Sequence, residues 1–418
     1  MMGFMSSPGY ANWQRTKARY LRRLRVESPR VLYFHQLNDP YSHLVVQKLK
    51  ALQEKYSLPI LSYVTGSTED VFKGDPEKFA TWGLKDAASI APFFNVEFSG
   101  TQPLTQAEID QANDHLLQRI ETKDFAEAAL EVGQALWSGE FARDRSAKIS
   151  IRGQSILTRN AQMRKRLGHY FGGMFYFEGE WFWGLDRLHL LEARLQEEGF
   201  GSGEFVCPLP EVKDFPTRAN DDIVVEYFPS LRSPYTAIGH KRVLEMAEHT
   251  GVQLELRPVM PMMMRGVPAP RAKQQYIMAD SGREARFYGD TFGPFCDPFG
   301  EPVKRAFAAY HFASQEGKAM NFVTEYLSAA FAEGLDITVD AGLGEVCRRA
   351  GFNISSVDFD SDWLAALEQN LAVMAEGSLW GVPSFRVTGG KCGEPFTCWG
   401  QDRIWRVAAE IAKRNGAA

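Results

Sequence analysis

Short apolar segments alternate along the chain with longer stretches whose apolar residues recur every three to four positions. In the first half, a short apolar strand opens the stretch 31–41 and precedes an amphipathic helix, and a second strand follows at 60–64. A helix-rich stretch then leads to a β-hairpin and a final helix. The second half repeats this order, with a strand that opens the stretch 224–235 and a second strand at 254–258. The pattern predicts an α/β fold with a small mixed sheet in each half. Helical insertions are expected at about 75–165 and 270–378.

Two motifs occur in both halves, in the same order. A Pro-Tyr dipeptide opens the first helix of each half, within Asp39-Pro40-Tyr41 and Ser233-Pro234-Tyr235. A Trp-Gly-x-Asp-Arg motif precedes each final helix, at 183–187 and 399–403. Such internal similarity indicates two tandem copies of one domain. We therefore expect a first domain at 1–200, a glycine- and proline-rich linker at 201–220, and a second domain at 221–418.

The composition excludes several classes of protein. Of the 418 residues, 44% are hydrophobic and 24% are charged, which is not the composition of a disordered or fibrous chain. The net charge of −5 argues against a protein that neutralises many nucleic-acid phosphates. No uncharged apolar run approaches the roughly 18 residues that a membrane span needs. We therefore expect neither a nucleic acid nor a membrane as partner.

Cysteine usage and the N-terminal region indicate a cytoplasmic protein. The cysteines are too few and scattered for a secreted disulfide framework, and neither a CxxC motif nor a Cys/His spacing typical of zinc occurs. They are Cys207, Cys296, Cys347, Cys392 and Cys398. The basic stretch 13–23 follows no signal-peptide core. It predicts a helix packed on the domain, with a membrane or nucleic-acid arm as the alternative. We expect no metal.

The tripeptide Ser233-Pro234-Tyr235 gives the first chemical indication. Proline suits the first turn of a helix, which places Ser233 at the N-cap. A helix N-terminus offers unpaired amides and a partial positive charge. A hydroxyl there can help to hold an anion such as a thiolate. Taken alone, the tripeptide is explained more simply as an ordinary helix cap.

Two further features lie near the end of the second half. A strand begins after Val382-Pro383. If that peptide bond is cis, the backbone of Val382 faces outward and can pair with an extended peptide, whereas a trans proline at the start of a strand is the common case. Asp402 lies near the N-terminus of the last helix, where it can cap the helix or receive the ammonium group of a ligand.

In this order, the three features resemble the DsbA-like branch of the thioredoxin superfamily. The resemblance is strongest to 2-hydroxychromene-2-carboxylate isomerase and the kappa-class glutathione transferases, and it covers nearly all of residues 221–414. It implies two thioredoxin-like domains, each with a helical insertion, and glutathione as a cosubstrate. Further matches to the family are Arg257-Pro258, Lys273, Tyr276, Asp280, Arg283, Ala285 and the stretch 331–337.

The resemblance also implies roles for individual residues. Glutathione would lie across the thioredoxin face with its thiolate stabilised by the hydroxyl of Ser233. Val382, before a cis Pro383, would pair with the cysteinyl backbone of glutathione. Asp402 would take the γ-glutamyl ammonium, with Gln401 beside it. The thiolate would add reversibly to a conjugated acceptor and leave after bond rotation. Five further side chains would either wall the acceptor pocket or pack in the core: Phe228, Tyr235, Met262, Met263 and Met264.

Both halves depart from the family pattern. In the second, the stretch 261–268 has no asparagine where the family has one, and Ser230 replaces a frequent aspartate. In the first, the carboxylate of Asp39 would repel a thiolate, and no proline occurs between Pro103 and Pro208. We expect a structural or regulatory first half. The alternative is a diverged ligand site walled by His169, Tyr170, Trp181, Phe182 and Trp183.

Three functional hypotheses follow. The leading one is a glutathione-dependent isomerase or transferase that acts on a small aromatic or conjugated acceptor. The second is a catalytically silent thioredoxin-like binding protein. The third, a dithiol–disulfide oxidoreductase, is the weakest because position 233 is serine and no CxxC motif exists. A monomer whose two domains pair within one chain is expected, with a homodimer as the alternative.

Overall fold

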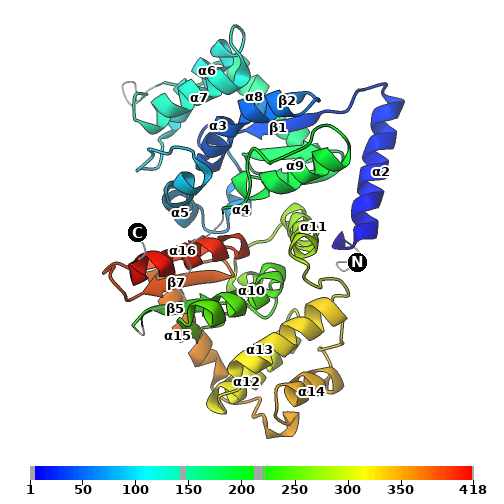
Figure 1. Ribbon diagram of the computed structural model, residues 1–418, viewed down its shortest axis with the longest axis vertical. Helices are drawn as coiled ribbons and strands as arrows, with labels where there is room; N and C mark the ends of the chain where they lie inside the picture. The colour runs from blue at the N-terminus through cyan, green and yellow to red at the C-terminus, as the bar shows by residue number, and fades with distance from the viewer. Residues whose placement is uncertain (1–4, 142–146, 211–219, 221, 417–418) are drawn as a thin grey trace. The chain divides into compact units, whose positions relative to one another are not determined.

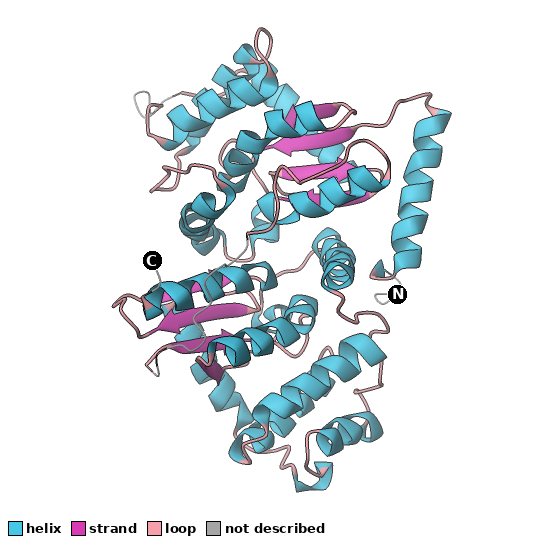
Figure 2. Cartoon of the chain, viewed as in Figure 1, coloured by secondary structure: helices cyan, strands magenta, loops and turns pink. Residues whose placement is uncertain are grey.

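The computed structural model describes residues 5–141, 147–210, 220 and 222–416. It is an α/β protein in which helices outnumber strands (Figure 2). Its internal contacts divide the chain into two compact units. We call Ala11–Pro210 the first domain, and Glu211–Ala418 together with Met1–Tyr10 the second domain (Figure 1). Much of the predicted linker, at 211–219, lies outside the described residues.

The first domain contains a four-stranded mixed sheet in the order β2-β1-β3-β4. β1 (Val31–His35) is parallel to β2 (Ile60–Val64) and antiparallel to β3 (Met174–Phe177). β3 forms a hairpin with β4 (Glu180–Trp183). The helices of this domain are α3 (Pro40–Lys55), α4 (Asp70–Lys73), α5 (Pro76–Ile90), α6 (Gln106–Arg119), α7 (Phe125–Trp137), α8 (Ile151–Leu167) and α9 (Leu188–Glu197).

The second domain has the same topology, with strands in the order β6-β5-β7-β8. β5 (Val224–Phe228) is parallel to β6 (Gln253–Leu256) and antiparallel to β7 (Ser384–Thr388), which pairs with β8 (Phe396–Trp399). Its helices are α10 (Pro234–Thr250), α11 (Arg271–Tyr288), α12 (Glu301–Gln315), α13 (Ala319–Ser328), α14 (Asp340–Arg349), α15 (Trp363–Glu376) and α16 (Ile404–Asn415). The predicted fold class, two thioredoxin-like domains with helical insertions, is confirmed.

The two sheets agree in register as well as in strand order. Val31 pairs with Ile60 in the first sheet, and Val225 pairs with Leu254 in the second. Each residue of the second pair follows its counterpart by 194 positions, as Tyr235 follows Tyr41. This agreement supports the predicted duplication, which stays a prediction.

The helical insertion of the second domain has an apolar core of its own. Val303, Phe307, Phe322 and Tyr326 from α12 and α13 are fully or almost fully buried in it. Leu231, from the loop that follows β5, is buried in the same cluster. The loop that leads into α10 is therefore anchored at one end by the sheet and at Leu231 by the insertion.

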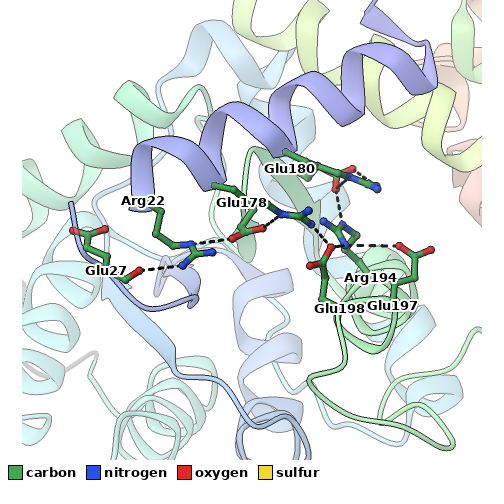
Figure 3. A network of polar contacts seen from close by, with 9 residues as sticks. Arg22, Glu27, Glu178, Glu180, Arg194, Glu197 and Glu198 are labelled. Atoms are coloured by element: carbon green, nitrogen blue, oxygen red, sulfur yellow. Dashed lines mark hydrogen bonds and ion pairs between the residues drawn. The ribbon is translucent and has the colours of Figure 1, made fainter. Parts of the chain in front are cut away.

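The basic N-terminal stretch forms α2 (Pro8–Leu24), a helix without a single buried residue. Ion pairs hold it instead: Arg15 bonds to Glu180, and Arg19 and Arg22 bond to Glu178. Figure 3 shows this network around Glu178 and Glu180. The arginines of the helix thus face carboxylates of the first domain, in agreement with a helix packed on the domain. Within the described ranges, no helix combines the length and apolar character that a membrane crossing requires.

Candidate functional site

Ser233 is the N-cap of α10, as the Ser-Pro pair predicts. Its Oγ accepts a hydrogen bond from the amide of Thr236 at 3.1 Å, and Pro234 occupies the first turn. Among the described residues, the hydroxyl proton of Ser233 has no acceptor. A hydroxyl that already accepts one bond can still donate one. The helix N-terminus therefore presents a donor in addition to its partial positive charge.

The Val382-Pro383 peptide bond is cis, which is the geometry that the family resemblance implies. Neither the amide nor the carbonyl of Val382 has a hydrogen-bond partner among the described residues. The loop itself is held firmly. The amide of Gly400 donates to the carbonyl of Pro383 at 2.9 Å, and Ser384 Oγ donates to the carbonyl of Gly381 at 2.8 Å. Val382 therefore offers a free backbone edge on a fixed loop.

The two residues after Gly400 have different environments. The side chain of Asp402 is 20% exposed and lies 3.8 Å from the guanidinium of Arg403. Gln401 is only 1% exposed. Its Nε2 donates to Glu284 at 2.9 Å, and its Oε1 accepts from Arg242. The side-chain amide of Gln401 is thus bonded within the protein through both its nitrogen and its oxygen, and it fixes the turn that presents Asp402.

The predicted pocket walls divide into core and surface positions. Phe228 is completely buried at the end of β5 and belongs to the core. Tyr235 is half-buried, and its hydroxyl donates to Asp280 at 2.9 Å. Met262 and Met263 are half-buried in a 3₁₀ turn, η3 (Met262–Arg265). Met264, in the same turn, packs against the insertion core.

Two arginines that the sequence analysis did not weigh bring parts of the site together. Arg232, directly before the cap, forms a bidentate pair with Asp297 at 2.6 and 2.8 Å and donates to the sulfur of Met263 at 3.5 Å. Arg265 donates to the carbonyl of Trp380, next to the cis-proline loop, at 2.9 Å. Burial lowers the pKa of Arg265 to about 10. The only sequence feature that could have pointed to Arg232 is its position directly before the cap residue Ser233.

These elements, a capped helix after the first strand and a cis-proline loop before the hairpin, match a known domain. The family model of the DSBA-like thioredoxin domain matches residues 224–412. This part of the chain is a DSBA-like thioredoxin domain.

Comparison with solved structures finds chains that align with about half of this chain. 2-Hydroxychromene-2-carboxylate isomerase is 18% identical, with 46% of this chain and 95% of that chain covered and a TM-score of 0.39. The cytosolic disulfide reductase DsbM from Pseudomonas aeruginosa is also 18% identical, with 46% and 98% covered and a TM-score of 0.34. No curated protein matches the chain.

The cysteines of the chain are not placed for thiol chemistry at the helix cap of the DSBA-like domain. Cys347 and Cys398 are buried, and burial raises the pKa of the Cys347 thiol to about 12. Cys296 is half-buried and lies 3.8 Å from Asp336; burial first, and that carboxylate in addition, raise its pKa. Reactive cysteines need a lowered pKa. The cap position of α10 is occupied by Ser233, so no thiol stands where a dithiol oxidoreductase needs one.

The first domain has a cap of the same geometry with different chemistry. Asp39 is the N-cap of α3 with backbone angles of −109° and 113°, against −106° and 116° for Ser233. Its Oδ2 accepts from the amide of Ser42 at 3.0 Å and from the Ser42 hydroxyl at 2.7 Å. Burial raises the pKa of Asp39 to about 6, while the bonds from Ser42 oppose that rise. The position of Ser233 is thus occupied here by a buried carboxylate.

The loop that faces this cap also differs. The amide of Gly184 donates to the carbonyl of Gly173 at 2.9 Å, as Gly400 does to Pro383, so Gly172-Gly173 corresponds to Val382-Pro383. A Cβ on Gly172 would lie 2.5 Å from Cβ of Gln36 and 3.0 Å from Oδ2 of Asp39. Only glycine fits so close to the cap. The loop of the first domain that corresponds to the cis-proline loop therefore lies directly against its helix cap.

The aromatic residues predicted to wall a diverged site in the first domain are mostly buried against one another. The ring of His169 stacks on the ring of Tyr170, with 4.5 Å between the ring centroids, and its centroid lies 5.0 Å from that of Trp181. His169, Tyr170, Trp181 and Phe182 are all buried. Trp183 is half-buried and stacks on Phe171 at 5.1 Å. This arrangement is typical of an aromatic core.

Proposed function

We propose that the DSBA-like domain binds glutathione and acts as an isomerase or transferase on a small aromatic or conjugated acceptor. The observation that carries the proposal is the Ser233 cap. Its Oγ accepts from Thr236 and keeps a proton to donate, at the positive end of a 17-residue helix. A thiolate at this point would receive a hydrogen bond and a favourable helix dipole. Both effects lower the pKa of a thiol toward neutral pH.

Two neighbouring groups support glutathione as the thiol. The unpaired backbone of Val382 suits the cysteinyl part of an extended tripeptide. Asp402 is partly exposed and acidic, which suits the γ-glutamyl ammonium. Gln401 acts indirectly, because its own amide is engaged with Glu284 and Arg242. Half-buried Tyr235, Met262 and Met263 would contact the acceptor.

In the proposed reaction, the glutathione sulfur forms a bond to one carbon of a conjugated double bond. The π electrons move to the electron-withdrawing group of the acceptor, and rotation about the resulting single bond becomes possible. The electrons then return and the carbon–sulfur bond breaks, which regenerates the thiolate and leaves an isomer. In a transferase reaction, a leaving group departs with the electron pair instead and the sulfur remains bound.

A catalytically silent binding domain is the second candidate. The engagement of Gln401 within the protein favours it, because one polar group of the glutathione face is no longer available to a ligand. The two candidates differ in turnover. A silent domain would bind the tripeptide or a peptide without converting any conjugated acceptor.

The test is calorimetric titration of reduced glutathione into the full chain and into Ser233→Ala. We expect binding by the wild type and a loss of about tenfold or more in the variant, since one hydrogen bond to a charged group contributes about 1.5–3 kcal/mol. Ser150→Ala is the matched control, because Ser150 caps α8 in the first domain by accepting from Gly153. Absence of heat at millimolar glutathione, or equal binding by Ser233→Ala, would contradict the proposal.

A further inference from the structure

A small cavity lies beside the Asp39 cap, and all residues that line it belong to the first domain. Its volume is about 110 Å³. Much of its wall is apolar, formed by Pro40, Phe79, Leu84, Ile109, Trp137 and Phe171. An apolar cavity of about 150 Å³ accommodates benzene. The apolar part of this smaller cavity therefore has room for a group of only a few carbon atoms, such as a short aliphatic side chain.

The acidic group of the cavity has no direct counter-ion. Asp39 is buried, and no ion pair joins it to any described residue. Arg164, whose positive charge lowers the pKa of Asp39, donates instead to Thr65 at 3.1 Å and to the carbonyl of Phe171 at 2.8 Å. A buried carboxylate without a paired cation is costly. An ammonium group in the cavity would provide the missing partner.

A second polar group of the cavity, the side-chain amide of Gln36, lacks a hydrogen-bond acceptor. Gln36 lines the cavity and is only 5% exposed. Its Oε1 accepts from Thr68 at 2.9 Å, whereas its Nε2 donates to no described residue. Buried amide groups are nearly always satisfied. Lys73 also lines the cavity and is paired at 2.8 Å with the exposed Asp70, so its ammonium can be shared. Both groups favour an anionic acceptor.

From these three observations, we propose that the first domain binds a small aliphatic amino acid in this cavity. Its ammonium pairs with Asp39, its carboxylate meets the amide of Gln36 and the ammonium of Lys73, and its side chain lies among the apolar walls. No bond is made or broken. The proposal is independent of glutathione binding, because every group involved belongs to the first domain.

The test is a titration of L-valine into the full chain, with binding monitored by saturation-transfer NMR. Isobutylamine and 3-methylbutanoate are the matched probes, since each keeps the branched body and lacks one of the two charges. Asp39→Asn removes the charge and keeps a side chain that can cap α3. Asp124→Asn is the control variant, because Asp124 caps α7 in the same domain through the amides of Ala126 and Glu127.

We expect L-valine to bind at least tenfold more tightly than either probe, and Asp39→Asn to weaken valine binding at least tenfold. Asp124→Asn should bind valine as the wild type does. The proposal is overturned if valine does not bind, if either single-charge probe binds as tightly, or if Asp39→Asn leaves binding unchanged. A circular dichroism spectrum identical to that of the wild type confirms that Asp39→Asn is folded.

Discussion

The two domains carry different side chains at equivalent helix caps: a hydroxyl in the second domain and a carboxylate in the first. Ser233 and Asp39 differ by only 3° in φ and in ψ, and each accepts a hydrogen bond from the amide three positions later. The hydroxyl can also donate a proton to an anion, whereas an ionised carboxylate only accepts. The comparison shows that this fold positions the cap, and that a single side chain decides the charge of the ligand it suits.

A second difference runs across the two sheets. In the first, Leu32 pairs with Leu61 and Tyr176. In the second, the corresponding Glu226 pairs with Glu255 and Arg386 and bonds to the side chain of Arg386. The same position is thus apolar in one domain and ionic in the other. The shared topology does not depend on which of the two chemistries fills this row.

The largest effect is expected when the cap of the second domain is given the chemistry of the first. Ser233→Asp keeps an efficient N-cap but places a negative charge where the thiolate would lie. We expect glutathione binding to fall by about 100-fold, which corresponds to about 2.7 kcal/mol. Calorimetric titration measures the loss. Ser233→Thr, which keeps a capping hydroxyl, should bind nearly as the wild type does; equal binding by both variants would show that the charge at the cap is irrelevant.

A smaller effect is expected from the ionic row of the second sheet. The side chain of Glu226 is 5% exposed and forms ion pairs with Arg386 and, at 2.7 Å, with Arg257. Glu226→Gln should destabilise the second domain by roughly 2 kcal/mol, less than for a fully buried pair because both arginines reach solvent. Hydrogen exchange in peptides from β5 and β6 measures this.

The matched control for this variant is Glu376→Gln. Glu376 bonds to the same Arg386 at 3.2 Å but is 68% exposed. Its loss should cost at most about 0.5 kcal/mol, as for other surface pairs. Equal exchange in the two variants would refute the distinction between the buried and the exposed partner.

The smallest effect concerns the stability of the first domain and its pH dependence. Burial raises the pKa of Asp39 from its ordinary value of 3.8 to about 6, so this group makes the domain less stable as pH rises between those two values and has no further effect at higher pH. Asp39→Asn should therefore stabilise the domain by about 1 kcal/mol near pH 8 and by much less near pH 4. Hydrogen exchange in peptides from β1 and β2 at the two pH values measures the difference.

Comparison of the wild type with Asp39→Asn at each pH separates the effect of Asp39 on stability from the effects of other buried groups. Burial lowers the pKa of His35 to about 3 and that of His43 to about 4. Both histidines make the domain less stable as pH falls below their ordinary pKa, in the variant as in the wild type. A stability difference that does not change with pH would mean that Asp39 is not the titrating group.

The fold could be predicted from the sequence because its signals are local and repeated. Alternating strand and helix periods, with the Pro-Tyr and Trp-Gly-x-Asp-Arg motifs, give the element order of both halves. The N-cap role of Ser233 follows from the proline beside it. The resemblance implied a cis bond before Pro383, which local propensity alone does not favour.

The long-range contacts of the site could not be predicted. The pair of Arg232 with Asp297 spans 65 positions, and the bond of Gln401 to Glu284 spans 117. Neither has a periodic pattern or a motif that marks it. The same holds for the cavity beside Asp39, whose walls come from several helices and loops of the first domain. Only the folded chain brings these residues together.

The most direct test of the comparison measures the pKa at which glutathione bound to the full chain ionises. The readout is the ultraviolet absorbance of the thiolate as pH is raised. A free thiol of this kind ionises at a pKa of about 8.5. The account predicts that glutathione bound at the Ser233 cap ionises at a clearly lower pH, and that Ser233→Asp removes this shift. Bound glutathione that ionises at the same pH as free glutathione, or an unchanged shift in Ser233→Asp, would contradict it.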